Sequence, residues 1–141
     1  MSEKILLIER EEGSEFLITK LIAEGTDGLF QTVCVPDLPR ALEYMDDHDF
    51  SVVLLDLASA GIPGPHAVAA LQAAAPAVPI VILALPDMLL ETFKAADEGA
   101  ADFIFKHKMK KDTLAHALNY ARKAATRKKA TAAPAGSHDA D

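Results

Sequence analysis

The chain has 141 residues, half of them hydrophobic, which suits one domain with its own core and is short for two. No stretch approaches the roughly 20 apolar residues needed to span a bilayer. The N-terminus also lacks the basic and apolar regions of a signal peptide, so the sequence predicts a cytoplasmic protein. The net charge of −7 divides into −13 over residues 1–105, +8 over 106–129 and −2 over the remainder, so we expect no binding of nucleic acid or a membrane by the acidic body.

The first two units of the chain each have the pattern of a strand followed by a helix. A compact apolar run predicts a buried strand over residues 4–8, and Ser14 is placed to cap a helix that Gly25 ends. A weaker strand is predicted over about 31–35, and Pro39 then opens a short helix. The second unit therefore repeats the first.

The third strand, residues 51–57, is an apolar run with one carboxylate near its end. Four consecutive apolar residues, two of them β-branched, are typical of a strand buried on both faces of a parallel sheet. Asp56 would lie at the carboxyl end of this strand, where open parallel sheets bind their ligands. Taken alone, Asp56 is better explained as the start of a turn, where Asp is common. A loop rich in Gly and Pro follows, and then an alanine-rich helix over 67–75.

The last two units complete the alternation. A buried strand is predicted over 79–84, with Asp87 as the cap of the next helix. A short strand over 103–105 is closed by Lys106, and Asp112 is expected to cap the last helix. Five strands alternating with five helices and joined by short connections predict an α/β fold built on a parallel sheet.

Charged residues stand at three of the predicted strand ends: Glu9, Asp56 and Lys106. With Gly64 eight residues after Asp56, and with the run 99–106, they make the sequence resemble the receiver domain of bacterial two-component response regulators. The resemblance covers nearly the whole chain. It implies a flavodoxin-like fold, with a five-stranded parallel sheet in the order 2-1-3-4-5 and five helices.

The resemblance also implies a site. In receiver domains a strand-end aspartate attacks a phosphohistidine of a partner kinase, an acidic pair holds Mg²⁺ with it, and a lysine contacts the phosphoryl group. By position, Asp56 would be the phosphoacceptor, Lys106 the lysine, Glu9 the first acid, and the backbone carbonyl of Ala58 a metal ligand. A hard divalent cation with oxygen ligands would neutralise the charge present during transfer. Without the resemblance, Glu9 is interpreted as a solvated residue at a strand end, and Lys106 is interpreted as a strand cap.

Several positions depart from the family pattern. Arg10 stands where the second acid is expected and offers no oxygen to Mg²⁺, which argues against a complete metal site. We expect Arg10 to substitute for the metal by forming a bidentate ion pair with Asp56. Ala84 stands where the family has a Ser or Thr that hydrogen-bonds the phosphoryl group. Phe103 occupies the position of the rotating aromatic residue, but without a hydroxyl at Ala84 we interpret it as packed core.

These features predict a receiver-like signalling domain of a phosphorelay, phosphorylated weakly or not at all at Asp56, that acts through contacts with a sensor histidine kinase or another signalling protein. A functional Asp56 phosphoacceptor and, more remotely, a flavodoxin-like cofactor-binding enzyme are the alternatives, and homodimerisation is left open. The chain has no Gly-rich phosphate loop after the first strand, which argues against a nucleotide-binding enzyme. We place the domain at residues 1–125. Residues 126–141 would be the basic end of the last helix and a tail that is disordered from Thr131.

Overall fold

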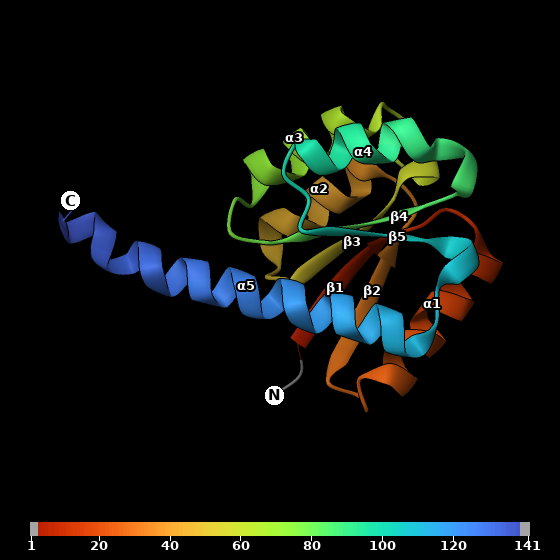
Figure 1. Ribbon diagram of the computed structural model, residues 1–141, viewed down its shortest axis with the longest axis horizontal. Coiled ribbons are helices and arrows are strands. Elements are labelled where there is room, and N and C mark those ends of the chain that lie inside the picture. The colour runs from red at the N-terminus through yellow and green to blue at the C-terminus, as the bar shows by residue number, and fades with distance from the viewer. Residues whose placement is uncertain (1–2, 139–141) are drawn as a thin grey trace.

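The computed structural model describes the backbone of residues 3–138 and the side chains of residues 3–126 (Figure 1). Strands and helices alternate along the chain, as predicted. The strands are β1 Glu3–Ile8, β2 Phe30–Val35, β3 Val52–Asp56, β4 Ile80–Ala84 and β5 Asp102–Phe105. The helices are α1 Glu12–Gly25, α2 Leu38–Asp47, α3 Gly64–Ala74, α4 Leu89–Asp97 and α5 Lys111–His138. Short 3₁₀ turns follow three of the strands: η1 Leu57–Ser59, η2 Pro86–Met88 and η3 Lys106–Lys108.

The five strands form one parallel sheet in the order β2-β1-β3-β4-β5, which confirms the order implied by the sequence. In this order β3 is the central strand with β1 as its neighbour, and the direction in which strands are added across the sheet reverses between them. The carboxyl ends of all five strands lie at one edge. This edge therefore collects the loops that follow β1, β3, β4 and β5.

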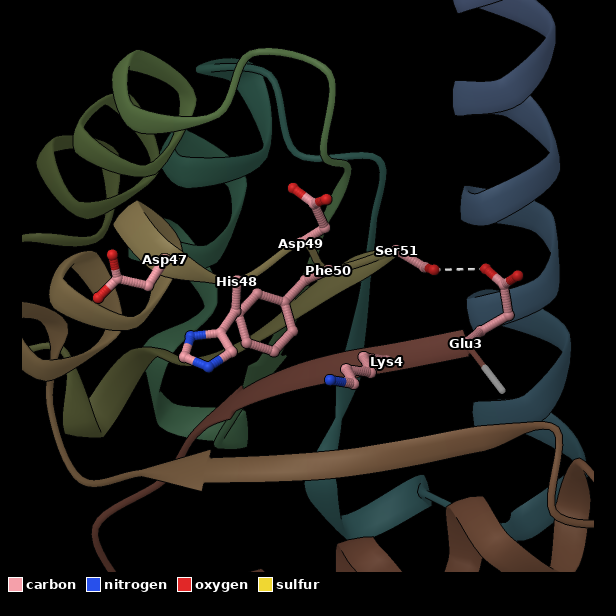
Figure 2. Close-up of a pocket in the computed structure, with 7 residues that line it drawn as sticks. All are labelled: Glu3, Lys4, Asp47, His48, Asp49, Phe50 and Ser51. Atoms are coloured by element: carbon pink, nitrogen blue, oxygen red, sulfur yellow. Dashed lines mark hydrogen bonds between the residues drawn. The ribbon is translucent and has the colours of Figure 1, made fainter. Parts of the chain in front are cut away.

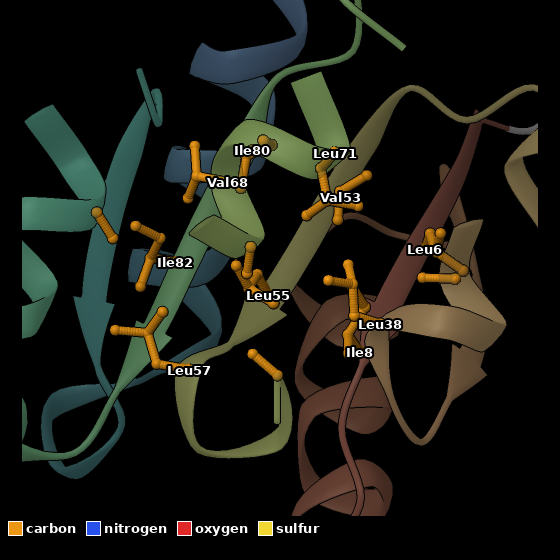
Figure 3. Close-up of a cluster of buried hydrophobic side chains, with 14 of the residues drawn as sticks. Leu6, Ile8, Leu38, Val53, Leu55, Leu57, Val68, Leu71, Ile80 and Ile82 are labelled. Carbon is orange, nitrogen blue, oxygen red and sulfur yellow. The ribbon is translucent and has the colours of Figure 1, made fainter. Parts of the chain in front are cut away.

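Helices cover both faces of the sheet, α1 and α5 on one face and α2, α3 and α4 on the other (Figure 1). Successive strand residues point to opposite faces. In β1, Leu6 and Ile8 join the core beneath α2, α3 and α4 (Figure 3), whereas Ile5 and Leu7 join the core beneath α1 and α5. Fully burying one such side chain contributes about 1.5–3 kcal/mol. Burial on both faces explains why the strands appear in the sequence as continuous apolar runs.

The caps predicted for α1, α4 and α5 differ in the structure, and α3 begins at Gly64, three residues before its predicted start. Helix α1 begins at Glu12, and Ser14 lies inside it, where its hydroxyl donates to Oε1 of Glu9 at 3.1 Å instead of capping the helix. Asp87 lies within η2, and Asp112 lies in the first turn of α5. A tertiary contact with a carboxylate has replaced the local cap that the sequence pattern of α1 indicated.

Helix α5 is the longest element and projects beyond the sheet (Figure 1). Its residues Leu114, Leu118 and Ala121 have no exposed surface and pack on the sheet, as expected from their helical spacing. Its backbone is helical to His138, and residues 139–141 lie outside the described residues. The disorder expected from Thr131 stays a prediction, and protease digestion tests it. None of the described helices is both long and apolar enough to cross a membrane.

Helices α1 and α5 approach so closely at Gly25 that a side chain does not fit. A Cβ at Gly25 would lie 2.5 Å from the backbone oxygen of Lys111 and 3.0 Å from Cβ of Ala115. We expect Gly25→Ala to lower the free energy of unfolding by about 1–3 kcal/mol in urea denaturation, because α5 must move away. Gly13→Ala is the matched control, since it changes the same helix where nothing lies within 4 Å, and it should be neutral or stabilising by up to about 1 kcal/mol. Equal effects of the two substitutions would contradict the close approach.

Candidate functional site

The loops that follow β1, β3 and β5 bring together the three charged residues found at the strand ends. Nζ of Lys106 lies 2.6 Å from Oε1 of Glu9 and 3.1 Å from Oδ1 of Asp56. Only 4% of Glu9 and 2% of Asp56 is exposed. One lysine therefore compensates two buried carboxylates. We call Glu9, Arg10, Asp56, Ala58, Ser59 and Lys106 together the strand-end site.

Glu9 is held in place by several donors. Its Oε1 accepts hydrogen bonds from Lys106 and from the hydroxyl of Ser14, and its Oε2 accepts one from the backbone N–H of Glu11 at 3.2 Å. The hydroxyl of Ser14 also accepts a hydrogen bond from Lys106 at 3.0 Å. Glu9 is thus a buried, hydrogen-bonded carboxylate, and its alternative interpretation as a solvated strand end is wrong.

The two carboxylate oxygens of Asp56 have different surroundings. Oδ2 accepts a hydrogen bond from the hydroxyl of Ser59 at 2.6 Å. Oδ1 is buried and has no hydrogen-bond partner among the described residues, although the charge of Lys106 lies 3.1 Å away. Ser59 was not predicted from the sequence. The available signal was a hydroxyl three residues after a strand-end aspartate, a spacing at which Ser often makes local hydrogen bonds.

The surroundings of Lys106 keep it charged. Burial alone would lower its pKa, but the hydrogen bond to Glu9 and the charge of Asp56 outweigh burial and raise the pKa above its ordinary value of 10.5. Lys106 is therefore a permanent cation near neutral pH. Its interpretation as a simple strand cap does not account for these contacts.

Arg10 contacts the β3–α3 loop and does not form the predicted ion pair with Asp56. Its guanidinium donates to the carbonyl oxygen of Ala58, and its backbone N–H donates to the hydroxyl oxygen of Ser59 at 2.9 Å. Lys106 and Ser59 already lie against the two oxygens of Asp56, which leaves the carbonyl in the turn η1 as the acceptor within reach. Arg10 therefore contacts the segment that carries Asp56 and not Asp56 itself.

Cys34 also lies near Glu9 but has the properties of an unreactive thiol. Its Sγ donates to the backbone oxygen of Glu9 at 3.6 Å. Burial, together with the negative charge of Glu15, raises the pKa of the thiol to about 12. Since thiolate is the reactive form, Cys34 has little nucleophilic character near neutral pH.

The family model of the response regulator receiver domain matches residues 5–119. The chain belongs to this family. Receiver domains are modules of two-component signalling that interact with histidine kinases and other signalling proteins. The fold and the family therefore agree with the expectation from the sequence.

Solved structures share the fold of this receiver at low sequence identity. NtrX from Brucella abortus has a TM-score of 0.80 at 22% identity, covering 94% of this chain and 29% of that chain. Its receiver domain alone has a TM-score of 0.74 at 23% identity, covering 84% and 98%. A CheY-like receiver protein from Methanospirillum hungatei JF-1 has a TM-score of 0.78 at 12% identity, covering 91% and 99%. The chain thus spans less than a third of that NtrX chain, and no curated protein shows a significant sequence match.

Receiver domains generally bind Mg²⁺ at the phosphorylation site, but the donors of this receiver do not fit that ion. Mg²⁺ requires an octahedral set of oxygens, of which one or two usually come from carboxylates that are free to bind it and several from water. Here two carboxylates share Lys106, and the carbonyl of Ala58 is already hydrogen-bonded by Arg10. Within the described residues, no group of three or more His, Cys, Asp or Glu side chains is arranged to hold a metal ion.

The two positions at which the family carries its switch residues, Ala84 and Phe103, lie on β4 and β5. Ala84 is fully buried at the end of β4, where it pairs with Phe105, and its methyl group offers no hydrogen bond. Phe103 is half-buried and packs edge-to-face between Phe93 and Phe105, with ring centroids 5.6 and 5.7 Å away. Phe103 thus packs at the margin of the core, and its interpretation as packed core stays a prediction.

A separate hollow of about 460 Å³ lies at the opposite edge of the sheet, near the amino ends of β1 and β3 (Figure 2). Inside it the hydroxyl of Ser51 donates to the carboxylate of Glu3. The lining mixes acidic and basic groups with one aromatic ring and one hydroxyl: Glu3, Lys4, Asp47, His48, Asp49, Phe50 and Ser51. The side chains in Figure 2 do not converge on a common point. This hollow shares no residue with the strand-end site.

Proposed function

We propose that the protein is a cytoplasmic receiver module of a two-component phosphorelay whose Asp56 is phosphorylated weakly or not at all. It would act through contacts with a sensor histidine kinase or another signalling protein. The observation that carries the proposal is the contact of Arg10 with the carbonyl of Ala58. A cation of the chain occupies a position where a receiver would offer oxygens to Mg²⁺.

The absence of two functional groups from the strand-end site should slow phosphoryl transfer to Asp56. The attacking carboxylate and the phosphodonor are both anionic, so transfer needs positive charge placed where negative charge gathers. Arg10 replaces a carboxylate that would hold the metal, and Ala84 replaces a hydroxyl that would bind the phosphoryl group. Loss of one preorganised contact of this kind commonly costs about 10²-fold in rate.

One observation favours the alternative, an Asp56 that works as a phosphoacceptor. Oδ1 of Asp56 has no hydrogen-bond donor in the described structure, and the ammonium group of Lys106 lies 3.1 Å away. A nucleophilic oxygen with an adjacent cation is what phosphoryl transfer needs. The match to the receiver family gives no support to the remote alternative of a flavodoxin-like enzyme.

Treatment of the purified protein with acetyl phosphate and Mg²⁺, followed by intact mass spectrometry, tests the proposal. We expect little or no addition of a phosphoryl group over a time course that would complete the reaction of an efficient receiver. Asp56→Asn is the control, because any modification that persists in this variant lies elsewhere in the chain. Rapid, stoichiometric modification that disappears in Asp56→Asn would overturn the proposal in favour of the working phosphoacceptor.

A further inference from the structure

Two oxygens that a divalent cation would use are already hydrogen-bonded by the chain. Oδ2 of Asp56 accepts from Ser59 at 2.6 Å, a short distance typical of a hydroxyl that donates to a charged carboxylate. The carbonyl oxygen of Ala58 accepts from the guanidinium of Arg10. Each donor supplies the positive or partly positive charge that a metal would otherwise bring to that oxygen.

A third hydrogen bond joins the two donors into one connected group. The backbone N–H of Arg10 donates to the hydroxyl oxygen of Ser59 at 2.9 Å, and that hydroxyl donates in turn to Asp56. Ser59 is only 4% exposed, so its hydroxyl depends on these two partners. The loop after β1 is therefore tied to the turn η1 through both the backbone and the side chain of Arg10.

The charges of the site also balance without a metal. Glu9 and Asp56 supply two negative charges, and Lys106 and Arg10 supply two positive charges around them. A cation that entered would meet a neutral site in which Lys106 already contacts both carboxylates. Its binding would have to displace hydrogen bonds and would gain little Coulomb energy in return.

We propose that Arg10 and Ser59 are positioning residues that together replace the divalent cation, so that the site keeps its conformation without Mg²⁺ and gains no stability from it. The inference rests on the proposed function only in treating this edge of the sheet as a receiver site. It concerns the regulation of the site by metal, whereas the proposed function concerns its phosphorylation. The two residues have different roles. Ser59 orients Asp56, and the guanidinium of Arg10 holds the carbonyl of Ala58.

The two contributions can be separated by substitution. Arg10→Asp removes the guanidinium, adds a carboxylate and keeps the backbone N–H that reaches Ser59. Ser59→Ala removes the hydroxyl from Asp56 and keeps the guanidinium. Arg10→Gln removes the charge without adding a metal ligand. Arg40→Asp is the matched control, because it makes the same charge change at an exposed residue of α2.

The test is the melting temperature of each protein in buffer with EDTA and in millimolar MgCl₂, at matched ionic strength. We expect no shift for the wild type, Arg10→Gln or Arg40→Asp, and a rise of a few degrees for Arg10→Asp, because a ligand that binds only the folded state stabilises it. Ser59→Ala should melt at a lower temperature than the wild type in EDTA, and Mg²⁺ should recover part of that loss.

A rise in the melting temperature of the wild type on addition of Mg²⁺ would overturn the inference, and this result does not depend on any variant folding. The absence of a response in folded Arg10→Asp would overturn it as well. Failure of the proposed function has a different signature. Rapid phosphorylation of the wild type in the presence of EDTA would contradict weak phosphorylation but would support a site that works without metal.

Discussion

Replacing Lys106 by methionine is expected to lower the free energy of unfolding by about 3–5 kcal/mol at neutral pH, the usual effect of removing one partner from a buried ion pair. Its ammonium group compensates Glu9 and Asp56, which are both almost fully buried. Methionine keeps most of the apolar length of the side chain, so the loss reports mainly on charge. Urea denaturation of the two proteins measures the difference.

The neighbouring Lys108→Met is the control, because Lys108 is exposed and its loss should change stability by no more than about 0.5 kcal/mol. The alkaline limb of the stability curve gives a second readout. The pKa of Lys106 is higher in the folded protein than its ordinary 10.5, so above that pH the folded state binds more protons than the unfolded state. The stabilisation by Lys106 therefore falls as the pH rises further. The wild type and Lys106→Met should therefore converge above pH 10.5. Equal effects of the two lysine substitutions would contradict this account of the site.

The strands were predictable because their burial is visible in the local sequence as continuous apolar runs. Both faces of the sheet are covered, so β3 and β4 contain almost only apolar residues and are interrupted by charge or turns only at their ends. The start of α1 was not predictable in the same way. The hydroxyl of Ser14 suits a helix cap, but a buried Glu9 five residues earlier competes for it, and that burial depends on the whole fold.

The same distinction explains what was predicted of the strand-end site. Parallel strands end at one edge, so the strand order places Glu9 and Asp56 at adjacent strand ends. Lys106 follows β5, on the far side of β4 from Asp56, and its long side chain spans that distance. The partner of Arg10 depends on finer geometry. The chain turns into η1 directly after Asp56, which directs the carbonyl of Ala58 and the hydroxyl of Ser59 toward the loop after β1. Hydrogen-bond directions within a three-residue turn are not encoded in the spacing of residue types.

Restoring the missing groups should increase the rate of Asp56 phosphorylation by acetyl phosphate by about 10²-fold or more. Arg10→Asp supplies a carboxylate to bind Mg²⁺ and frees the carbonyl of Ala58. Ala84→Ser supplies a small hydroxyl at the buried end of β4, where a larger side chain would strain the core. We expect the single substitution Arg10→Asp to accelerate the reaction, but only when Mg²⁺ is present. The double variant should react faster still, as measured by intact mass over time. Adding Asp56→Asn should abolish the gain. A rate that stays at the wild-type value in both variants would show that neither substitution limits phosphorylation of this receiver.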